Sequence, residues 1–354
     1  MRVLCVNDRP PGGDSGAEVH LAQLVQGLRA AGDEVEVFTG NPRAGLGRLR
    51  DSWDPGARRA LEQKVEQFGP DVLHFHNVVR ELSVAVLTAA PGVPRVLTVH
   101  DGRLLGDADG QQPLLRLAQR LRARHDRRVA RRCGASVLAV SGPLATRLAD
   151  AGFPKVQRCW PWAEITCPAS DPRATKDLAY VGRLDPDKGV DVLVEAFLRA
   201  DQPDARLLLA GTGSLTPPTD DRVVLLGRLD REGVSRLMGS VRAVVVPSLP
   251  ALRPEGAPLV LIEALVHGRP VIVSDDPGCV ELARAGESQP AGLVVPAGSV
   301  QDLAEAIGRV LDDDALTNEL AAGAQTAAKD HAEVVGLARV RAAYYLARSG
   351  AVGA

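Results

Sequence analysis

Short apolar segments alternate with amphipathic segments along the first half of the chain. The segment after residue 16 has apolar residues at Ala17, Leu21, Leu24, Val25 and Leu28, which is the 3.6-residue spacing of a helix. Strands are predicted at 2–6, 34–39, 71–76, 94–100 and 135–141, and further helices at 57–68, 79–90 and 113–132. Buried strands that alternate with helices indicate a parallel sheet covered on both faces.

A second series of alternating segments begins near residue 176. Strands are predicted at 177–182, 205–211, 222–227, 242–248, 269–275 and 291–297, and helices at 189–200, 230–240, 258–268 and 300–311. Residues 158–176 are rich in proline and lack periodicity, which is typical of a linker. The predicted fold class is therefore α/β, with two doubly wound parallel-sheet (Rossmann-like) domains in tandem. Because such sheets bind ligands beyond the carboxyl ends of their strands, we expect the domains to face a cleft.

Composition agrees with two domains and argues against several classes of partner. The 354 residues exceed the roughly 250–300 that one core accommodates. A net charge of −2 argues against a nucleic-acid partner. The apolar segments are shorter than the roughly 20 residues that span a bilayer, and Asn7, Asp8 and Arg9 interrupt any export signal. The five scattered cysteines lack a CxxC spacing, so reduced thiols, no structural zinc site and a cytoplasmic location are expected.

Two turns that contain glycine are candidates for phosphate binding. The turn at 12–16 precedes a predicted helix, so its backbone N–H groups lie at the positive end of the helix dipole. Neither this turn nor 211–216 has the G-x-G-x-x-G spacing of nicotinamide sites, so a dehydrogenase is weakly supported. On spacing alone, phosphate contact and a structural tight turn are equally compatible with these glycines.

Two cationic residues follow the first predicted strand of the second half. Arg183 and Lys188 lie in GRLDPDKG, between a strand and a helix, where both side chains can reach one ligand. A diphosphate leaving group gains negative charge as its bond to a sugar breaks, and two cations stabilise that charge. An isolated pair of this kind is equally compatible with a surface loop.

Two glutamates accompany the apolar segment PEGAPLVLIEAL. If both were helical, Glu255 and Glu263 would lie about 12 Å apart along the axis. Glycosidase carboxyl pairs are about 5–9.5 Å apart, so we expect separate roles for these glutamates at one elongated ligand. Glu263 lies between Ile262 and Ala264 in an apolar helix and needs a polar partner.

Histidines end two of the predicted strands. His100 is followed by Asp101 at the carboxyl end of a strand, where ligand-binding residues gather. His74 and His76 have the i, i+2 spacing of a chelating pair, but no third ligand with suitable spacing is evident. Packing in the core is therefore favoured for His74, and no metal-binding residue is predicted.

An arginine-rich helix is predicted at 113–132. Leu114, Leu117 and Leu121 lie on one of its faces, a pattern typical of a helix that touches a membrane or an anionic acceptor. A solvated surface helix explains the same pattern and is favoured, because arginine is abundant throughout the chain.

Together, these motifs resemble those of the retaining glycosyltransferases of family 4, which have the GT-B fold of two Rossmann-like domains. The resemblance rests on the E-x7-E motif of Glu255 and Glu263, on GRLDPDKG, and on the order of DVLHFHN, TVHD, ASVLAVS and LAGTGSL. It implies an acceptor-side domain at 1–165, a nucleotide-sugar-binding domain at 166–335, and a C-terminal helix at 336–354 that packs back on the first domain.

The resemblance also implies four catalytic residues. Arg183 and Lys188 would clamp the donor diphosphate, Glu255 would bind hydroxyls of the donor sugar, and His100 would lie beside the reacting sugar. Retention would follow from attack on the front face of the sugar, with the departing phosphate oxygen accepting the acceptor's proton. No metal ion or cofactor would be needed, because the two cations take the place of a metal.

Further residues would bind the donor by the same resemblance. Gly16 would approach the diphosphate from the first domain, and Glu263 would hold the nucleotide ribose. The predicted donor-binding residues are Gly16, Arg183, Lys188, Glu255, Gly256, Ala257, Pro258, Leu259 and Glu263.

The chain departs from the family pattern at two places. Ser15 precedes Gly16 where the family has a Gly-Gly doublet, so only Gly16 is carried over. Trp160 and Trp162 lie where relatives usually have Pro-Asn-Gly. Two tryptophans could stack on a sugar ring, but packing in the linker is favoured, because large aromatic side chains are ordinarily buried.

The sequence therefore predicts a retaining glycosyltransferase. It would move a hexosyl group from a nucleotide-diphosphate sugar to a hydroxyl of a soluble acceptor, a small molecule such as a natural product or a glycan. One alternative is a membrane-associated transferase with a lipid-linked or cell-envelope acceptor. Another is a non-catalytic sugar-nucleotide-binding protein, which would share the same binding residues.

Overall fold

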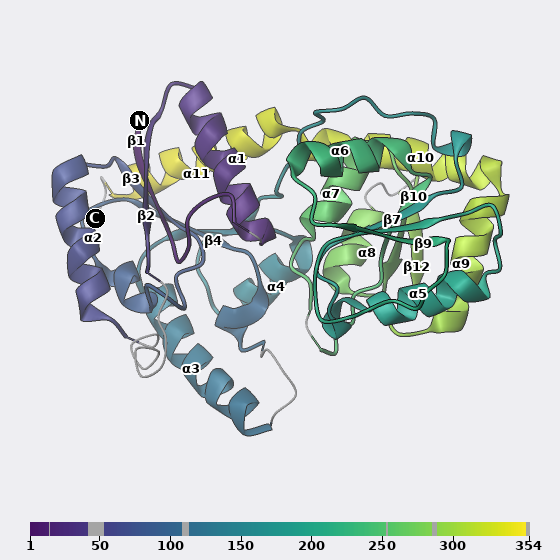
Figure 1. The fold of residues 1–354 in the computed structure, drawn as a ribbon. Coiled ribbons are helices and arrows are strands. Elements are labelled where there is room, and N and C mark those ends of the chain that lie inside the picture. The colour runs from purple at the N-terminus through teal and green to yellow at the C-terminus, as the bar shows by residue number, and fades with distance from the viewer. Residues whose placement is uncertain (14, 42–52, 108–112, 253, 285–288, 352–354) are drawn as a thin grey trace. The chain divides into compact units, whose positions relative to one another are not determined.

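The computed structural model contains two six-stranded sheets and describes residues 1–13, 15–41, 53–107, 113–252, 254–284 and 289–351 (Figure 1). The chain divides into one compact unit of Met1–Trp160 with Glu333–Ala354 (unit 1) and another of Pro161–Ala332 (unit 2). Every paired strand in both sheets is parallel to its neighbour, so the predicted α/β class is confirmed. The sequence placed the divisions a few residues later, at 165/166 and 335/336, and residues 352–354 lie outside the described part.

The sheet of unit 1 has the strand order β2-β1-β3-β4-β5-β6. Its strands are β1 (Arg2–Asn7), β2 (Glu34–Thr39), β3 (Val72–Phe75), β4 (Arg95–Val99), β5 (Ser136–Ala139) and β6 (Val156–Arg158). Cys5 pairs with His74, and His74 pairs with Val96. Because paired residues of parallel strands point to the same face, Cys5 and His74 share one face of the sheet.

Five α-helices are described in unit 1. They are α1 (Gly16–Ala30), α2 (Pro55–Phe68), α3 (Pro113–Arg132), α4 (Gly142–Asp150) and the C-terminal α11 (Glu333–Ala351). Helix α11, yellow in Figure 1, contacts α1 and the strands β3, β4 and β5, so the end of the chain packs on the first sheet.

The helix predicted at 79–90 is wrong. This segment contains only the 3₁₀ turn η2 (Val84–Thr88), and a second short turn, η3 (Gly102–Leu105), follows β4. Ser83 and Ala90 flank η2 with φ angles of 62° and 46°, which are incompatible with a continuous right-handed helix. The hydroxyl of Ser83 instead accepts hydrogen bonds from the N–H groups of Asp54 and Ala85, which stabilises the turn.

The sheet of unit 2 has the order β12-β11-β10-β7-β8-β9. Its strands are β7 (Leu178–Val181), β8 (Leu207–Ala210), β9 (Val223–Gly227), β10 (Ala243–Val246), β11 (Val271–Ser274) and β12 (Gly292–Val295). The first strand, β7, lies between β8 and β10, so chain order reverses between β7 and β10. In open α/β sheets this reversal leaves a crevice at the carboxyl ends of the two strands, where ligands bind.

The helices of unit 2 cover its sheet and include two that the sequence did not predict. They are α5 (Val190–Arg199), α6 (Arg231–Ser240), α7 (Leu259–Val266), α8 (Pro277–Ala283), α9 (Val300–Asp312) and α10 (Asp314–Ala328), with the 3₁₀ turns η4 (Pro172–Ala174), η5 (Pro186–Lys188) and η6 (Lys329–His331). Helices α8 and α10 are the two additions. Asp276 and Asp313 cap them, and they lie just after the strand predicted at 269–275 and the helix predicted at 300–311.

Buried polar side chains of unit 2 form hydrogen bonds with residues 166–170 of the predicted linker. The hydroxyl of Ser235 accepts hydrogen bonds from the N–H groups of Thr166 and Cys167 at 3.2 and 3.1 Å. Arg269, which is fully buried, donates to the carbonyl oxygens of Ser170 and Val241. Trp160 and Trp162 are 4% and 0% exposed, so both indoles are packed, as the sequence favoured.

Candidate functional site

Two loops at the carboxyl ends of β7 and β10 approach each other closely in unit 2. Gly189 has φ 65°, and a Cβ atom there would lie 2.1 Å from the carbonyl oxygen of Pro247. The N–H of Leu249 donates to the carbonyl oxygen of Asp187 at 3.1 Å. Only glycine permits this approach, which brings the loop of Arg183 and Lys188 against the loop that leads to Glu255.

Lys188 and Glu255 form an ion pair at this contact. The Lys188 ammonium donates to Oε1 of Glu255, and the buried hydroxyl of Ser248 donates to the same oxygen at 2.8 Å. The N–H of Glu255 donates to Oδ2 of Asp276 at 2.9 Å. The two side chains of the pair are 21% and 15% exposed. Three loops therefore hold Glu255 in one position at the reversal point of the sheet.

Arg183 lies beside this pair and is balanced by two carboxylates. Its guanidinium donates to Asp185 and, at 2.7 Å, to Asp187. Asp185 also accepts hydrogen bonds from the N–H and the hydroxyl of Ser214, in the loop after β8. The pKa of Asp185 is lowered, and the hydrogen bond from the Ser214 N–H is the largest cause. The Arg183 side chain is 46% exposed, so an incoming anion would compete with both carboxylates for it.

The loop of Glu255 continues into the N-terminus of α7. Gly256, Ala257 and Pro258 are partly buried, Pro258 is the N-cap residue, and Leu259 begins the helix. Among the described residues, no side chain caps α7. Uncapped backbone N–H groups at the positive end of a helix dipole are suited to binding an anion.

Glu263 lies one turn into α7, whereas Glu255 precedes the helix. The two glutamates therefore do not share a helix, and the axial separation of about 12 Å for two helical residues does not apply to them. Burial raises the pKa of Glu263 to about 7, and the nearby Arg231 opposes this shift. Its carboxyl group is thus divided between neutral and ionised forms at neutral pH, and it can donate to or accept from a hydroxyl group.

Four of the seven histidines cluster in unit 1. They are His20 in α1, His74 in β3, His76 just after β3 and His100 just after β4. His76 Nδ1 lies 3.1 Å from His100 Nε2, and the two rings stack with their centroids 5.4 Å apart. Burial lowers the pKa of His20, His74 and His100 to about 3. These imidazoles are therefore neutral at physiological pH, and the partly exposed His100 can act as an uncharged hydrogen-bonding group.

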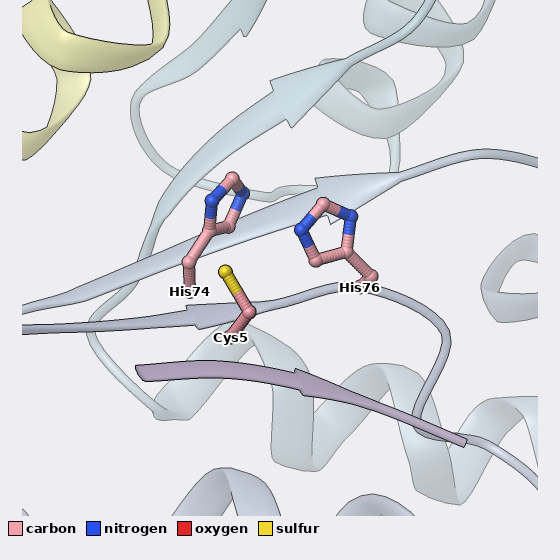
Figure 2. Close-up of side chains that lie close together, drawn as sticks. All are labelled: Cys5, His74 and His76. Carbon is pink, nitrogen blue, oxygen red and sulfur yellow. The ribbon is translucent and has the colours of Figure 1, made fainter. Parts of the chain in front are cut away.

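The structure adds a residue that the sequence missed, Cys5. One ligand atom each from Cys5, His74 and His76 lies within 4.8 Å of the other two (Figure 2). Spacing along the chain could not reveal this group, because Cys5 meets His74 only through the register of β1 on β3. His74 is fully buried, as predicted, with its two ring nitrogens bonded to the hydroxyls of Tyr344 and Thr98.

Gly16 is the first residue of α1, and Ser15 caps this helix. The Ser15 hydroxyl accepts from the N–H of Glu18, while the Glu18 carboxylate accepts from the N–H of Ser15. The serine that departs from the family doublet thus forms a capping box with Glu18. The capping box therefore uses the N–H of Ser15, which belongs to the predicted phosphate-binding turn, and Gly16 remains at the positive end of the helix.

The structure therefore groups the predicted residues in two places. Arg183, Lys188, Glu255 and residues 256–263 lie around the carboxyl ends of β7 and β10 in unit 2, whereas Gly16 and His100 lie in unit 1. The residues of unit 2 that the sequence missed are Ser214, Ser248 and Asp276. Ser248 ends a predicted strand, and Ser214 and Asp276 follow one, which was the available signal.

Two protein-family models match most of the chain. The model described as "Glycosyltransferase Family 4" matches residues 14–161, and the model described as "Glycosyl transferases group 1" matches residues 175–313. The chain is a glycosyltransferase family 4-like protein. The first match contains the four clustered histidines, and the second contains Arg183, Lys188, Glu255 and Glu263.

Relatives of this glycosyltransferase align over nearly its full length. It is 27% identical over 365 residues to the phosphatidyl-myo-inositol mannosyltransferase of Mycobacterium leprae, an alignment that covers 95% of this chain and 94% of the relative. It is 26% identical over 392 residues to the D-inositol 3-phosphate glycosyltransferase of Arthrobacter sp., covering 95% and 90% of the two chains.

Solved structures share the fold of the glycosyltransferase. Sucrose-phosphate synthase from Thermosynechococcus elongatus superposes with a TM-score of 0.77 and 22% identity, covering 98% of this chain and 99% of the other. Anabaena Alr3699/HepE in complex with UDP-glucose superposes with a TM-score of 0.70 and 21% identity, covering 96% and 98%. These likenesses establish the GT-B fold. None of the described helices has the length and apolar character needed to span a bilayer.

Proposed function

We propose that this glycosyltransferase moves a hexosyl group from a nucleoside-diphosphate sugar to a hydroxyl of a soluble acceptor, with retention of configuration at the anomeric carbon. The observation that carries the proposal is the meeting of Arg183, Lys188 and Glu255 at the reversal point of the second sheet. Two cations and a carboxylate in one crevice are suited to a ligand that joins a diphosphate to a polyhydroxyl group.

The two cations act on the leaving group. As the bond between the anomeric carbon and the phosphate oxygen breaks, its electron pair moves to the diphosphate, where Arg183 and Lys188 stabilise the added charge. The acceptor oxygen forms the new bond on the same face of the sugar, and the departing phosphate oxygen takes the acceptor's proton. This step needs no protein nucleophile, and Glu255 is already engaged by Lys188 and Ser248.

The remaining residues position the donor. Glu255 accepts hydrogen bonds from sugar hydroxyls, residues 256–259 present the N-terminus of α7 to the diphosphate, and Glu263 binds the ribose. His100, which is neutral, contacts the reacting sugar. In this proposal Arg183 and Lys188 neutralise the diphosphate, so transfer proceeds without a metal ion at the donor and is unchanged by EDTA.

A donor panel followed by product analysis tests the proposal. UDP-, GDP-, ADP- and TDP-sugars are screened by thermal shift, and the donor that stabilises the chain is then incubated with acceptor extracts while nucleotide release is measured. Release that depends on acceptor distinguishes an enzyme from a non-catalytic binding protein. An NMR spectrum of the product that shows the opposite anomer to that of the donor would refute retention.

A second candidate function, transfer to a lipid-linked acceptor, is favoured by the surface of α3. Leu117 and Leu121 are 55% and 54% exposed and lie one turn apart on this helix. Arg120, Arg124 and Arg128 are also exposed, at the same four-residue spacing. Exposed leucines beside a row of arginines fit a helix that lies on an anionic bilayer. A relative is named as a phosphatidyl-myo-inositol mannosyltransferase, which agrees with this alternative.

Vesicle binding separates the two acceptor classes. The lipid-acceptor function predicts co-sedimentation with vesicles of anionic phospholipid that is lost when Arg120, Arg124 and Arg128 are changed to glutamate. A matched variant changes Arg199, Arg236 and Arg309, three exposed helical arginines of unit 2, and keeps vesicle binding. Equal binding of both variants, or no binding by the unchanged protein, would leave the soluble acceptor as the proposal.

A further inference from the structure

Three metal-ligating side chains meet at the reversal point of the sheet of unit 1. Cys5 comes from β1, His74 from β3, and His76 from the residue after the end of β3. The order β2-β1-β3 places β1 and β3 side by side, and all three residues are buried. Figure 2 shows the thiol of Cys5 pointing toward His74, with the His76 ring on its other side.

The hydrogen bonds of the two histidines are those of metal ligands. His76 Nε2 is buried and has no hydrogen-bond partner among the described residues. Its other nitrogen, Nδ1, lies 3.1 Å from His100 Nε2, and Nδ1 of His74 lies 2.7 Å from the Tyr344 hydroxyl. A histidine that binds a metal through one nitrogen is ordinarily held by an outer partner at the other. Both histidines have such a partner at Nδ1. Nε2 of His76 is therefore left for a metal, whereas Nε2 of His74 must first lose its hydrogen bond to the Thr98 hydroxyl.

We propose that Cys5 Sγ, His74 Nε2 and His76 Nε2 form a binding site for a soft, thiolate-preferring metal ion, with Cu(I) favoured over Zn(II). One thiolate and two imidazoles are ligands that both ions accept. Binding of the metal breaks the 2.7 Å hydrogen bond between the Thr98 hydroxyl and His74 Nε2.

Burial explains the preference for a monovalent ion. When a metal binds Cys5, it replaces the thiol proton, which leaves to solvent. Cu(I) with one thiolate is electrically neutral, whereas Zn(II) would leave a net positive charge in the core, which burial penalises.

The required movement is small. Metal–ligand bonds of about 2.0–2.3 Å place neighbouring ligand atoms roughly 3.3–3.7 Å apart. One ligand atom from each of the three residues already lies within 4.8 Å of the other two, so rotation of side chains is enough to close the site. A bound ion would join β1 to β3 through side chains in addition to their backbone hydrogen bonds.

Metal titration of the whole chain tests the site. The protein is purified without metal, kept reduced, and titrated with Cu(I) against a chromogenic Cu(I) chelator, and in a second arm with Zn(II) against a zinc indicator. We expect one equivalent of Cu(I) per chain, a thiolate-to-copper charge-transfer band in the near ultraviolet, and weaker binding of Zn(II). The band arises in the unchanged protein, so this measurement does not depend on the folding of a variant.

Variants assign the ligands. Cys5→Ala and His76→Phe are expected to weaken Cu(I) binding by more than the roughly 10–100-fold typical of a lost outer partner, and Tyr344→Phe by an amount within that range. Cys159→Ala removes another buried cysteine of unit 1 and is expected to bind normally. Absence of the charge-transfer band, or Cu(I) binding in Cys5→Ala equal to that in Cys159→Ala, would overturn the proposal. These readouts are independent of sugar transfer, so they separate this site from the proposed activity.

Discussion

Replacing Lys188 with methionine tests the donor site most directly. Methionine keeps much of the length of the side chain but removes the ammonium group that donates to Glu255. In the donor complex the same group would contact the diphosphate. A hydrogen bond to a charged group contributes about 1.5–3 kcal/mol, so we expect affinity for the matching nucleoside diphosphate to fall roughly 10–150-fold. Turnover should fall further, by on the order of 10²–10³-fold, because charge on the leaving group grows in the transition state.

The neighbouring contacts allow folding and binding to be separated. Lys188→Met removes the ammonium group but keeps the hydrogen bond from the Ser248 hydroxyl to Glu255. The Glu255 side chain is only 15% exposed, so some stability is lost as well. Glu255→Gln removes the charge but keeps an oxygen that can accept from Ser248. If the two charges act as a pair, the double variant should be no less stable than Lys188→Met alone, because the mostly buried negative charge that Lys188 balanced is gone as well.

Isothermal titration of the full chain with UDP, GDP, ADP and TDP measures the affinities, and nucleotide release measures turnover. Lys176→Met is the matched control, because Lys176 is an exposed lysine of the same unit, 4.0 Å from Asp312. We expect this control to bind and turn over normally. Wild-type affinity and turnover in a folded Lys188→Met variant would refute both the role of Lys188 and the assignment of the donor crevice.

Three further predictions follow from the same geometry. Asp187→Asn removes one of the two carboxylates that bind Arg183, so nucleoside diphosphate binding, measured by titration, should tighten up to about fivefold. Unchanged or weaker binding would contradict the idea that the carboxylates and the diphosphate compete for Arg183. Glu263 keeps its proton in the folded chain up to pH about 7 but loses it in the unfolded chain near 4.5, so it lowers stability progressively as pH rises through this window. Glu263→Gln should therefore raise the free energy of unfolding by up to about 3 kcal/mol at pH 8 and leave it unchanged at pH 4, as measured by urea denaturation. If the stabilities of the two proteins change with pH in parallel, the pKa of Glu263 is not raised. His100→Ala should lower turnover about 10²-fold without weakening nucleotide binding, because His100 is proposed to contact the reacting sugar and not the nucleotide; the exposed His125→Ala is the control.

Much of the fold followed from the sequence because side-chain periodicity is a local property. Residues 190–199 have the periodicity of an amphipathic helix and residues 243–246 the apolar character of a buried strand. Both patterns are visible in the local sequence, so both elements were predicted. The helix predicted at 79–90 was wrong, because the local pattern does not show the positive φ angles of Ser83 and Ala90 or the hydrogen bond between Ser83 and Asp54, 29 residues away. Helices α8 and α10 were missed because their capping aspartates also occur in ordinary turns.

The candidate site divides in the same way. The sequence by itself determined that Arg183 and Lys188 follow a strand and that Glu255 and Glu263 surround the start of an apolar helix, because local order decides where strands and helices end. Only the tertiary structure decided that Lys188 meets Glu255, 67 residues away, because β7 lies beside β10 and Gly189 lets their loops touch. It also decided that Cys5 lies with His74 and His76, because the register of β1 on β3 is set by backbone hydrogen bonds and by burial of the whole core.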